Sequence, residues 1–433
     1  MARAEDQRAG ELPAVSRSGV LPDLGALRVR DYRLLWCGML AMSALMPLQF
    51  TTLLLYLQEV PPANVQLLLA GALGAMRGGV MLLAGIPGGA LADRFDRRRL
   101  LLLTQSVAIV ANAGIALLLL SRVDGAVGLA ALFALIFVAG GAMTVDTPTR
   151  QAFVPQLVPP ERLANAVALD AVAMQLAFPL SLPLAGILIE RLGFGGAFAS
   201  SLIGHLIVLL MVLQIRSHGV VSAGSHRGSL MSAMREGVRY TRRTPSVLWL
   251  ILLVLVVMAV AFPPVGSLGP VWVTRVLGLS PAQFGFFGAL WGLGALLGSV
   301  AMTNAGRFQH MERLTAAGAL TFAVCVVIWG YSRSVALSGA VNLVLGVSLA
   351  VMQVSARSQV QRTVPNAMQG RVLSLLMLNM GLAQFMSGPV GALAQAFTFE
   401  RVVPVLGWLS LALVGGVIVA RRSVGRRRTM MHQ

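Results

Sequence analysis

Twelve long apolar stretches, separated by short polar or charged segments, constrain this chain more than any other feature. Only 12% of its 433 residues are charged and its mean hydropathy is +0.79, whereas a soluble domain carries about 25% charged residues. Because about 20 apolar residues cross a bilayer as a helix, the pattern predicts an all-α membrane protein with twelve transmembrane helices. The predicted spans are 32–58, 64–92, 100–121, 126–147, 163–190, 194–215, 246–275, 281–304, 314–331, 335–356, 369–397 and 401–420.

The arginines predict which end of the spans is cytoplasmic. All 34 basic residues are Arg. If the chain starts in the cytoplasm, five of them fall in outer loops and one lies inside a span, namely Arg122, Arg191, Arg275, Arg333, Arg401 and Arg77. The remaining 34 − 5 − 1 = 28 lie on the inner side, which is the positive-inside bias. We therefore expect a multi-pass protein of the bacterial inner (plasma) membrane with both termini in the cytoplasm.

Composition also excludes several classes of protein. The net charge of +18 does not indicate nucleic-acid binding, because no aromatic and basic residues alternate as in a single-strand platform. A chain without Lys has no phosphate-binding loop, which argues against ATP-driven pumping. Cys37 and Cys325 lie in spans without a ligand spacing and are expected to be buried, apolar-like residues. No nucleophile–base pair or metal cluster is apparent, so we expect no enzyme, cofactor or metal.

The middle of the chain divides it into two halves of six spans each. Residues 216–245 are rich in Ser, Gly, His and Arg. The predicted organisation is a disordered cytoplasmic lead over 1–31, a six-helix bundle over 32–215, a cytoplasmic linker over 216–245, a second bundle over 246–420, and a basic cytoplasmic tail over 421–433. Within the linker, 231–243 fits two descriptions equally, a basic helix on the membrane surface and a solvated connection. The arginines near 421–428 fit an inner anchor attracted to anionic lipid.

The two halves repeat each other in sequence. Pro159 and Pro365 are 206 residues apart, and so are Pro183 and Pro389. Two such bundles can rock about a central site and expose it to each side in turn. Small residues let helices approach closely in lipid, and they recur in the second and eighth spans as either static packing or a sliding contact. These glycines are Gly71, Gly74, Gly78, Gly79, Gly285, Gly288, Gly292, Gly294 and Gly298.

Two inner loops carry a family resemblance. The segment Gly89…Asp93-Arg94…Arg97-Arg98 is similar to the signature loop of the major facilitator superfamily. The run Asp146-Thr-Pro-Thr-Arg150-Gln resembles its branch of enterobactin exporters and macrolide-type efflux proteins, as does Val364-Pro365…Gly370-Arg371-Val372. The chain departs from the pattern in two places. Asp96 stands where a second Gly is usual, and Leu182-Pro183 replaces a Gly-Pro pair.

The resemblance implies a fold of two pseudo-symmetric six-helix bundles and the function of a secondary active transporter. It favours a proton-coupled exporter of a bulky hydrophobic compound, siderophore-like or antibiotic-like, working by alternating access. An importer of a small organic solute is one alternative, and a transport-inactive membrane sensor or assembly factor is another. The expected partners are a small-molecule substrate, protons and membrane lipid, with the protein itself a monomer.

Charged residues at the inner end are candidates for a cytoplasmic gate. A carboxylate there can accept hydrogen bonds from a helix N-terminus and pair with Arg. By repeat position, Asp93 would meet Arg371, although an ordinary anchoring loop would carry similar charges. Asp146 fits either a shared network or a local turn cap. The candidate gate residues are Asp93, Arg94, Arg97, Arg98, Asp146, Arg150 and Arg371.

Three residues are candidates for substrate binding or proton coupling. Arg77 lies 16 residues before Asp93, about 24 Å along a helix, and Asp170 is roughly 10 Å into span five. Because buried charge in lipid is costly, such residues usually mark function. Asp170 fits a proton carrier or a fixed counter-ion, and Arg77 fits a contact to an anionic group or a link between helices. Gln49 is a mid-span polar group that fits the cavity lining, whereas His205 is expected to be packed and hydrogen-bonded.

Overall fold

The computed structural model describes residues 24–121, 125–217, 230–303 and 310–430, and within these ranges every regular element is helical. A short 3₁₀ turn, η1 (Gly25–Arg28), leads into the first long helix. The first half comprises α1 (Arg30–Glu59), α2 (Gln66–Arg94), α3 (Arg97–Leu120), α4 (Ala126–Leu157) and α5 (Pro160–Gln214). The second half comprises α6 (Leu230–Arg243), α7 (Pro245–Val256), η2 (Val257–Ala261), η3 (Pro263–Ser267), α8 (Gly269–Arg275), α9 (Pro281–Thr303), α10 (Met311–Tyr331), α11 (Val335–Thr363), α12 (Asn366–Phe385), α13 (Ser387–Phe397) and α14 (Phe399–Met430).

These helices add up to the predicted number of spans. Ten stretches of the described chain are helical, long and apolar enough to cross a membrane, and the bent pair formed by the end of α6 and the α7 segment adds an eleventh. Helix α5 has 55 residues and changes direction at Gly193. Because about 20 residues suffice for one crossing, α5 holds two spans, which brings the count to twelve. The prediction of an all-α, multi-span membrane protein is confirmed.

Helices α4 and α11 extend well beyond their apolar stretches. Helix α4 was expected to end at residue 147 and α11 at residue 356, but they continue to Leu157 and Thr363. Both then stop one residue before a Val-Pro pair, Val158-Pro159 and Val364-Pro365. Since a residue that precedes proline disfavours the helical conformation, the proline, and not the loss of hydropathy, sets each end.

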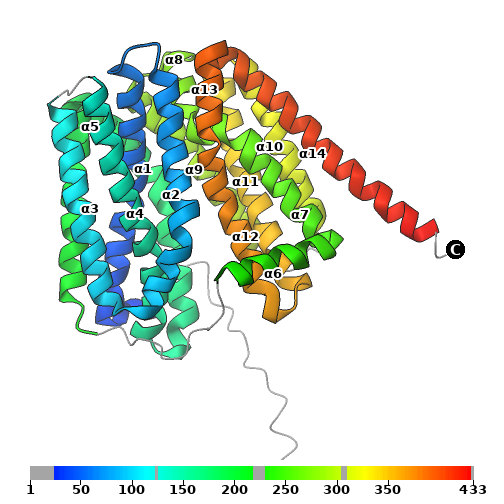
Figure 1. Ribbon diagram of the computed structural model, residues 1–433, viewed down its shortest axis with the longest axis horizontal. Helices are drawn as coiled ribbons and strands as arrows, with labels where there is room; N and C mark the ends of the chain where they lie inside the picture. Colours follow the sequence, from blue (N-terminus) through cyan, green and yellow to red (C-terminus); the bar gives the residue numbers. More distant parts are fainter. Residues whose placement is uncertain (1–23, 122–124, 218–229, 304–309, 431–433) are drawn as a thin grey trace, which may run out of the picture.

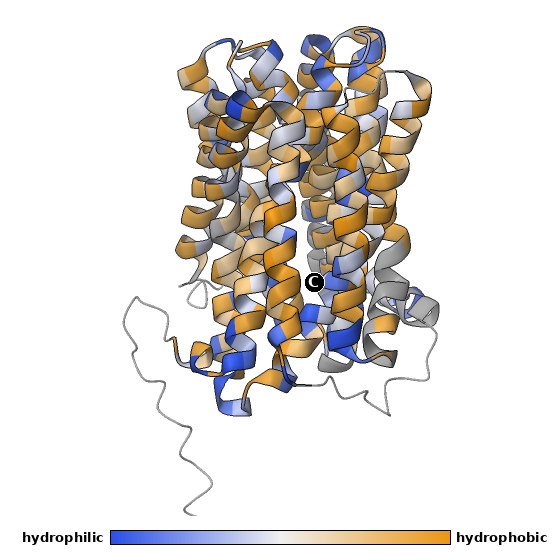
Figure 2. Cartoon of the chain, turned by 90° about the vertical axis from the view of Figure 1, so that its left-hand side faces the viewer, coloured by the Kyte–Doolittle hydropathy of each residue, from blue (hydrophilic) through white to orange (hydrophobic). Residues whose placement is uncertain are grey.

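All spans run between the same two ends of the molecule (Figure 1). Helix α1 begins at the end drawn lowest, which we call the inner end after the sequence-based prediction, and its opposite the outer end. Hydrophobic residues dominate the long middle of the bundle, whereas hydrophilic residues collect at the two ends (Figure 2). This distribution fits a bilayer around the middle.

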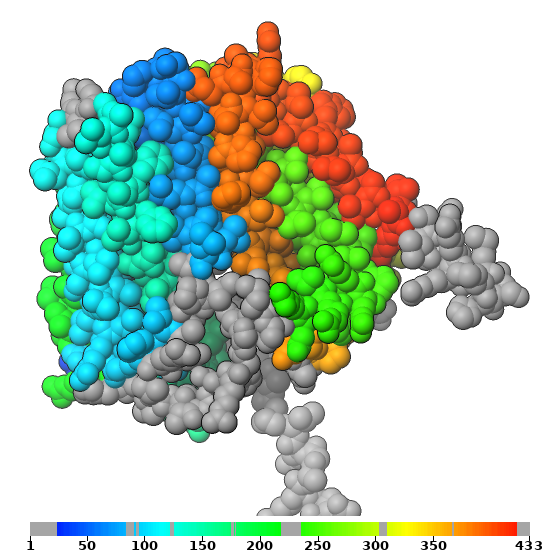
Figure 3. Space-filling model, viewed as in Figure 1, coloured from blue at the N-terminus to red at the C-terminus, as the bar shows by residue number. Residues whose placement is uncertain are grey.

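Glycines bring the two halves into direct backbone contact. A Cβ atom on Gly71 would lie 2.8 Å from Cα of Gly391, and one on Gly78 would lie 2.2 Å from the backbone nitrogen of Phe385. Helix α2 therefore packs on α12 and α13 without side chains between them. On the other side of the molecule, a Cβ on Gly285 of α9 would lie 2.4 Å from the Leu182 carbonyl oxygen of α5. The space-filling view shows the α2 surface meeting the α12–α13 surface along the middle of one flank (Figure 3).

The same contact explains how Leu182 is accommodated in place of the glycine of the Gly-Pro pair that the family resemblance leads us to expect. A Cβ on Gly288 would lie 2.8 Å from Cδ1 of Leu182, so α9 leaves room for the leucine. In the second half the sizes are exchanged, because Gly388 of α13 faces the side chain of Ala75 at 2.8 Å. Not every predicted glycine lies between the halves. Gly294 and Gly298 instead contact α11 within the second half.

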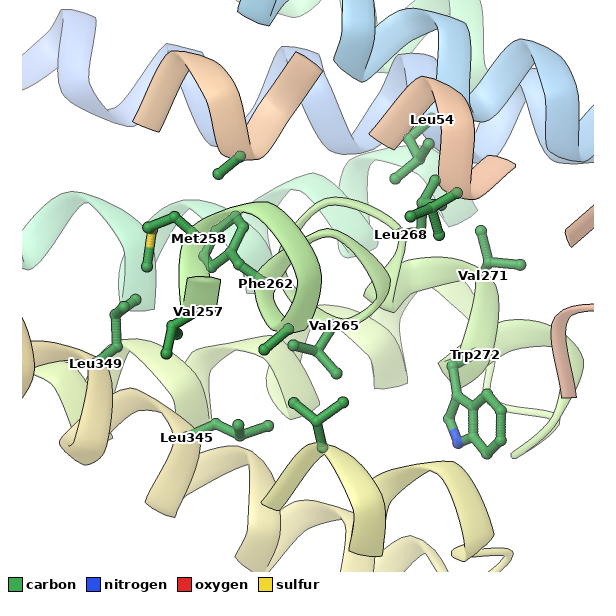
Figure 4. Packing of buried hydrophobic residues seen from close by; sticks show 14 of the residues in the cluster. Leu54, Val257, Met258, Phe262, Val265, Leu268, Val271, Trp272, Leu345 and Leu349 are labelled. Atoms are coloured by element: carbon green, nitrogen blue, oxygen red, sulfur yellow. The ribbon is translucent and has the colours of Figure 1, made fainter. Parts of the chain in front are cut away.

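A buried apolar cluster continues from one half into the other. Leu54 of α1 belongs to the same cluster as Leu268 and Val271 of the seventh span, and Figure 4 shows these side chains around η3 and α8. That span contains two π-helical turns, with Pro263 and Pro264 at the second. Proline has no N–H to donate and interrupts the regular ladder, which accounts for the irregular geometry. Within the described residues, side chains of both halves thus pack into one continuous apolar core.

The outer turns of the fifth–sixth and eleventh–twelfth spans are related by the repeat. Gly193 has φ 68° and Thr398 has φ 71°, and the two are 398 − 193 = 205 residues apart. This region of backbone space suits Gly and strains a β-branched residue. The first half therefore carries the favourable residue at its turn and the second half an unfavourable one.

We predict that Thr398→Gly stabilises the protein. Relief of the strained backbone is worth about 1–3 kcal/mol, of which glycine's greater unfolded freedom cancels roughly 0.5–1 kcal/mol. Thermal unfolding in detergent should show a higher midpoint for this variant. Thr398→Ala, which keeps the positive φ, is the control and should show little change. An equal or lower midpoint for Thr398→Gly would contradict the prediction.

Candidate functional site

The inner half of the first bundle contains a buried ion pair. Arg150 donates from Nε to Asp146 Oδ2 at 2.5 Å and from Nη2 to Oδ1 at 3.3 Å, one turn apart on α4. From α3, the Thr104 hydroxyl and the Gln105 amide donate to Asp146 Oδ1 at 3.0 and 2.9 Å. Both ions are almost fully buried, at 1% and 3% exposed. Asp146 lies inside a helix, so its alternative role as a turn cap is wrong.

The signature loop begins α3 with a side-chain cap. Asp96 has φ −57°, which does not require glycine, and its carboxylate accepts from the backbone N–H of Arg99 at 2.8 Å. Such a cap satisfies one of the free donors of a helix start. The substitution of Gly by Asp96 is thereby explained. Arg98 donates to the Leu213 carbonyl at 2.8 Å, and Arg97 is buried with no partner for Nε among the described residues.

The predicted latch joins Asp93 of α2 to Arg371 of α12. Helix α2 reaches Arg94, but the side chains of Asp93 and Arg94 lie outside those that the structure describes. Arg371, near the start of α12, forms an ion pair with Glu236 of α6. A latch to Asp93 would therefore require Arg371 to change partners.

A chain of hydrogen bonds connects Gln49 to the ion pair. Gln49 donates from Nε2 to the Ser201 hydroxyl and to His205 Nε2, both at 3.0 Å. His205 Nδ1 lies 3.3 Å from Gln105 Oε1, and Gln105 in turn donates to Asp146. Because an amide donates to Nε2, the pattern assigns a neutral His205 with its proton on Nδ1. The expectation that His205 is packed and hydrogen-bonded is confirmed.

Asp170 lies against the first span. The Tyr32 hydroxyl donates to Asp170 Oδ1 at 3.0 Å and to the Ala166 carbonyl at 2.8 Å. The Trp36 indole donates to the neighbouring Leu169 carbonyl at 3.0 Å. Within the described residues the carboxylate of Asp170 has no cationic partner. Its partner is thus a neutral phenol.

Arg77 lies apart from Asp170. Its guanidinium is 4.8 Å from the ring centroid of Phe50 on α1, a cation–π contact. The side chain is half-buried, and the described part of the chain offers it no carboxylate. Of the three candidates for substrate or proton binding, Gln49 lies on α1 and contacts α5, and Arg77 contacts α1 through Phe50. The structure does not bring Arg77 and Asp170 together.

Polar contacts also join the two halves at the outer end. Arg275 of α8 donates to the Gln58 carbonyl at 3.0 Å and to the side chain of Gln66. Gln395 of α13 accepts from the Leu67 N–H at 3.0 Å and donates to the Ala63 carbonyl at 3.3 Å. Together with the glycine contacts, these bonds hold the halves together at that end.

Several residues of the candidate site were not predicted from the sequence. Tyr32, Gln105 and Phe50 carry no motif, and only their partners across the bundle reveal their roles. Glu236 could have been found, because it is the only acid in a basic segment. One expectation was wrong: Cys37 is exposed, whereas Cys325 is buried. Cys37 lies on a helix face that the first bundle leaves uncovered.

Comparison with known proteins identifies the fold and the relatives. The family model described as transmembrane secretion effector, within the major facilitator superfamily, matches residues 26–427. The staphyloferrin A transporter of Staphylococcus aureus (strain NCTC 8325 / PS 47) is 21% identical over 327 residues, covering 76% of this chain and 81% of that protein. The enterobactin exporter EntS of Shigella boydii serotype 4 (strain Sb227) is 25% identical over 327 residues, covering 72% and 75%.

Solved transporters share the arrangement of helices. The nucleoside transporter NupG superimposes with a TM-score of 0.73 at 11% identity, covering 91% of this chain and 99% of that one. A bacterial homologue of the human lysosomal transporter Spinster, in an inward-facing and unoccupied conformation, gives 0.67 at 15% identity, covering 90% and 95%. The predicted fold of two six-helix bundles is that of these structures.

We predict that the Asp146–Arg150 pair supports the first bundle. Removing one member of a buried ion pair leaves an uncompensated charge and costs about 3 kcal/mol or more. Asp146→Asn and Arg150→Gln should each destabilise the protein by that amount in SDS-driven unfolding from mixed micelles, and the double variant by less than the sum. Glu161→Gln, an exposed acid, is the control and should change little. Additive effects would show that the two residues do not act as a pair.

Proposed function

Because this chain belongs to the transmembrane secretion effector family of the major facilitator superfamily, it is a multi-pass membrane transporter, and we propose that it is a proton-coupled exporter. The proposed cargo is a bulky, largely apolar compound of the siderophore or antibiotic type, moved out across the bacterial inner membrane by alternating access. The names of two relatives, a staphyloferrin A transporter and an enterobactin exporter, support the siderophore class.

The contact between the halves is the observation that carries the proposal. The hydrogen bonds of Arg275 and Gln395 between the halves lie at the outer end. The glycine contacts of α2 and α9 lie deeper and consist largely of backbone atoms and small side chains. At such a contact one half can rotate against the other, whereas a few hydrogen bonds at one end can break and re-form. In this proposal the structure represents the outer-closed state, in which an exporter would take up its cargo from the cytoplasm.

Asp170 is the proposed carrier of the coupling proton. A fixed counter-ion needs a cation, and the only hydrogen bond described for its carboxylate comes from Tyr32. A phenol can donate to the ionised carboxylate and accept from the protonated one. The carboxyl can therefore load and release a proton without leaving its partner unsatisfied.

Arg77 is the proposed contact for an anionic group of the cargo. Its guanidinium stacks on Phe50 and keeps its N–H donors free of described carboxylates. Stacking on the ring holds the planar guanidinium group in place, and its N–H groups, which point outward in that plane, stay available to a ligand. Gln49, next to Phe50 in sequence, would line the same region. The gate at the inner end would use Asp93, Arg94, Arg97, Arg98 and Arg371, with the Asp146–Arg150 pair behind them.

The coupling role predicts a separation of proton movement from binding. Asp170→Asn keeps an oxygen that accepts from Tyr32 but cannot release a proton, so proton counterflow driven by a siderophore gradient in proteoliposomes should fall at least about tenfold. Tyr32→Phe removes only the hydrogen bond and should retain most of the counterflow. Full counterflow with Asp170→Asn would refute the coupling role. Net siderophore movement opposite to export would refute the direction.

The cargo contact predicts charge selectivity. Arg77→Gln should weaken binding of an anionic siderophore about tenfold or more, since a charge-assisted bond contributes about 1.5–3 kcal/mol, while binding of a neutral analogue of equal size stays unchanged. Arg77→Lys keeps the charge but loses the planar fork and should lie between. Isothermal titration in detergent measures both ligands. Equal losses for the anionic and the neutral ligand would assign Arg77 to linking α1 and α2 instead.

A further inference from the structure

Helix α6 lies across the inner ends of other helices. It is bent by 111° from the span that follows it, and only Thr244 separates its last residue, Arg243, from Pro245 at the start of α7. In Figure 1 it crosses in front of the lower ends of α12 and α7. A helix that ends one residue before a membrane span, at nearly a right angle to it, lies at the depth of the lipid headgroups.

The two faces of α6 differ completely. With about 100° of rotation per residue, Gly237, Tyr240 and Thr241 share one face, and they are buried or half-buried against the second half. A Cβ on Gly237 would lie 2.9 Å from the Arg371 carbonyl oxygen, so this face lies directly on α12. The opposite face carries four exposed arginines, namely Arg235, Arg239, Arg242 and Arg243.

The charge on this face is not balanced by the protein. Glu236 is the only acid of α6, and it is paired with Arg371. Within the described residues the four arginines have no carboxylate partner. The helix therefore presents four positive charges on one face, at headgroup depth, to whatever lies beside the protein.

We propose that this arginine face binds the headgroups of anionic phospholipids in the inner leaflet. Each Arg or Lys near an anionic membrane surface strengthens association about fivefold, so four on one face form a strong site, and the spacing along that face suits several phosphates. Bound lipid holds α6 at the membrane surface. Because Glu236 connects α6 to Arg371, bound lipid also steadies the inner end of α12.

Hydrogen exchange of the full-length protein in nanodiscs tests the site. Compared with phosphatidylcholine alone, discs with one third phosphatidylglycerol should slow amide exchange in 230–243 about tenfold, and high salt should reverse this effect. The quadruple variant Arg235→Gln, Arg239→Gln, Arg242→Gln, Arg243→Gln should lose the response. A tail variant, Arg426→Gln, Arg427→Gln, Arg428→Gln, is the matched control and should keep it.

Three results would overturn the proposal. Equal exchange in the two lipid compositions would show that α6 binds no anionic lipid. An unchanged response in the quadruple variant would place the lipid elsewhere. Slowing by inorganic phosphate in phosphatidylcholine discs, without further slowing by phosphatidylglycerol, would identify a site for free anions. If a cytosolic acidic protein were the partner, its binding would persist in detergent without any dependence on lipid.

Glu236→Gln tests the connection to α12 separately. In the wild type, phosphatidylglycerol should slow exchange both in 230–243 and at the start of α12, over 366–375. In Glu236→Gln the first effect should remain and the second should disappear, because the ion pair with Arg371 is lost. If phosphatidylglycerol slowed amide exchange at the start of α12 as much in this variant as in the wild type, the ion pair would not carry the effect of bound lipid to α12.

Discussion

The close contact between glycine-bearing helices of the two halves is the constraint on which the rest of the structure depends. Gly71 and Gly78 place the backbone of α2 on α12 and α13, and Gly285 places α9 on α5. In lipid, helices associate through such packing and not through burial from water. A contact made largely of backbone atoms and small side chains fixes how near the halves lie but resists rotation weakly. In the proposed alternating-access cycle, polar bonds at the ends, such as those of Arg275, would decide which end is closed.

The two halves differ in what holds each of them together. A hydrogen-bonded chain from Gln49 through His205 and Gln105 to Asp146 joins helices of the first half. Such a buried hydrogen-bond network costs much to break in a medium of low dielectric constant, so this half is suited to move as a rigid body. The described core of the second half is mainly apolar and aromatic. The candidate proton and cargo residues therefore lie on the more rigid body.

Sequence periodicity predicted most spans to within a few residues, because hydropathy and proline positions are local properties. It missed the inner ends of α4 and α11. In α4 the missed part begins where Asp146 and Arg150 satisfy each other inside the helix. It identified Asp170 and Arg77 as unusual charges but not their neighbours Tyr32 and Phe50, because contacts between distant helices leave no local pattern. Sequence reasoning also missed the ion pair of Arg371 with Glu236, which joins two separate helices.

Distance measurements between spin labels test most directly whether the halves rock about this contact. In a variant with Cys37 and Cys325 replaced, one label pair at Glu59 and Arg401 reports on the outer end, and another at Arg99 and Gln361 reports on the inner end. All four residues are exposed. When a siderophore and a proton gradient are applied, the outer distance should grow while the inner distance shrinks. Two distances that stay fixed, or that change in the same direction, would contradict the account.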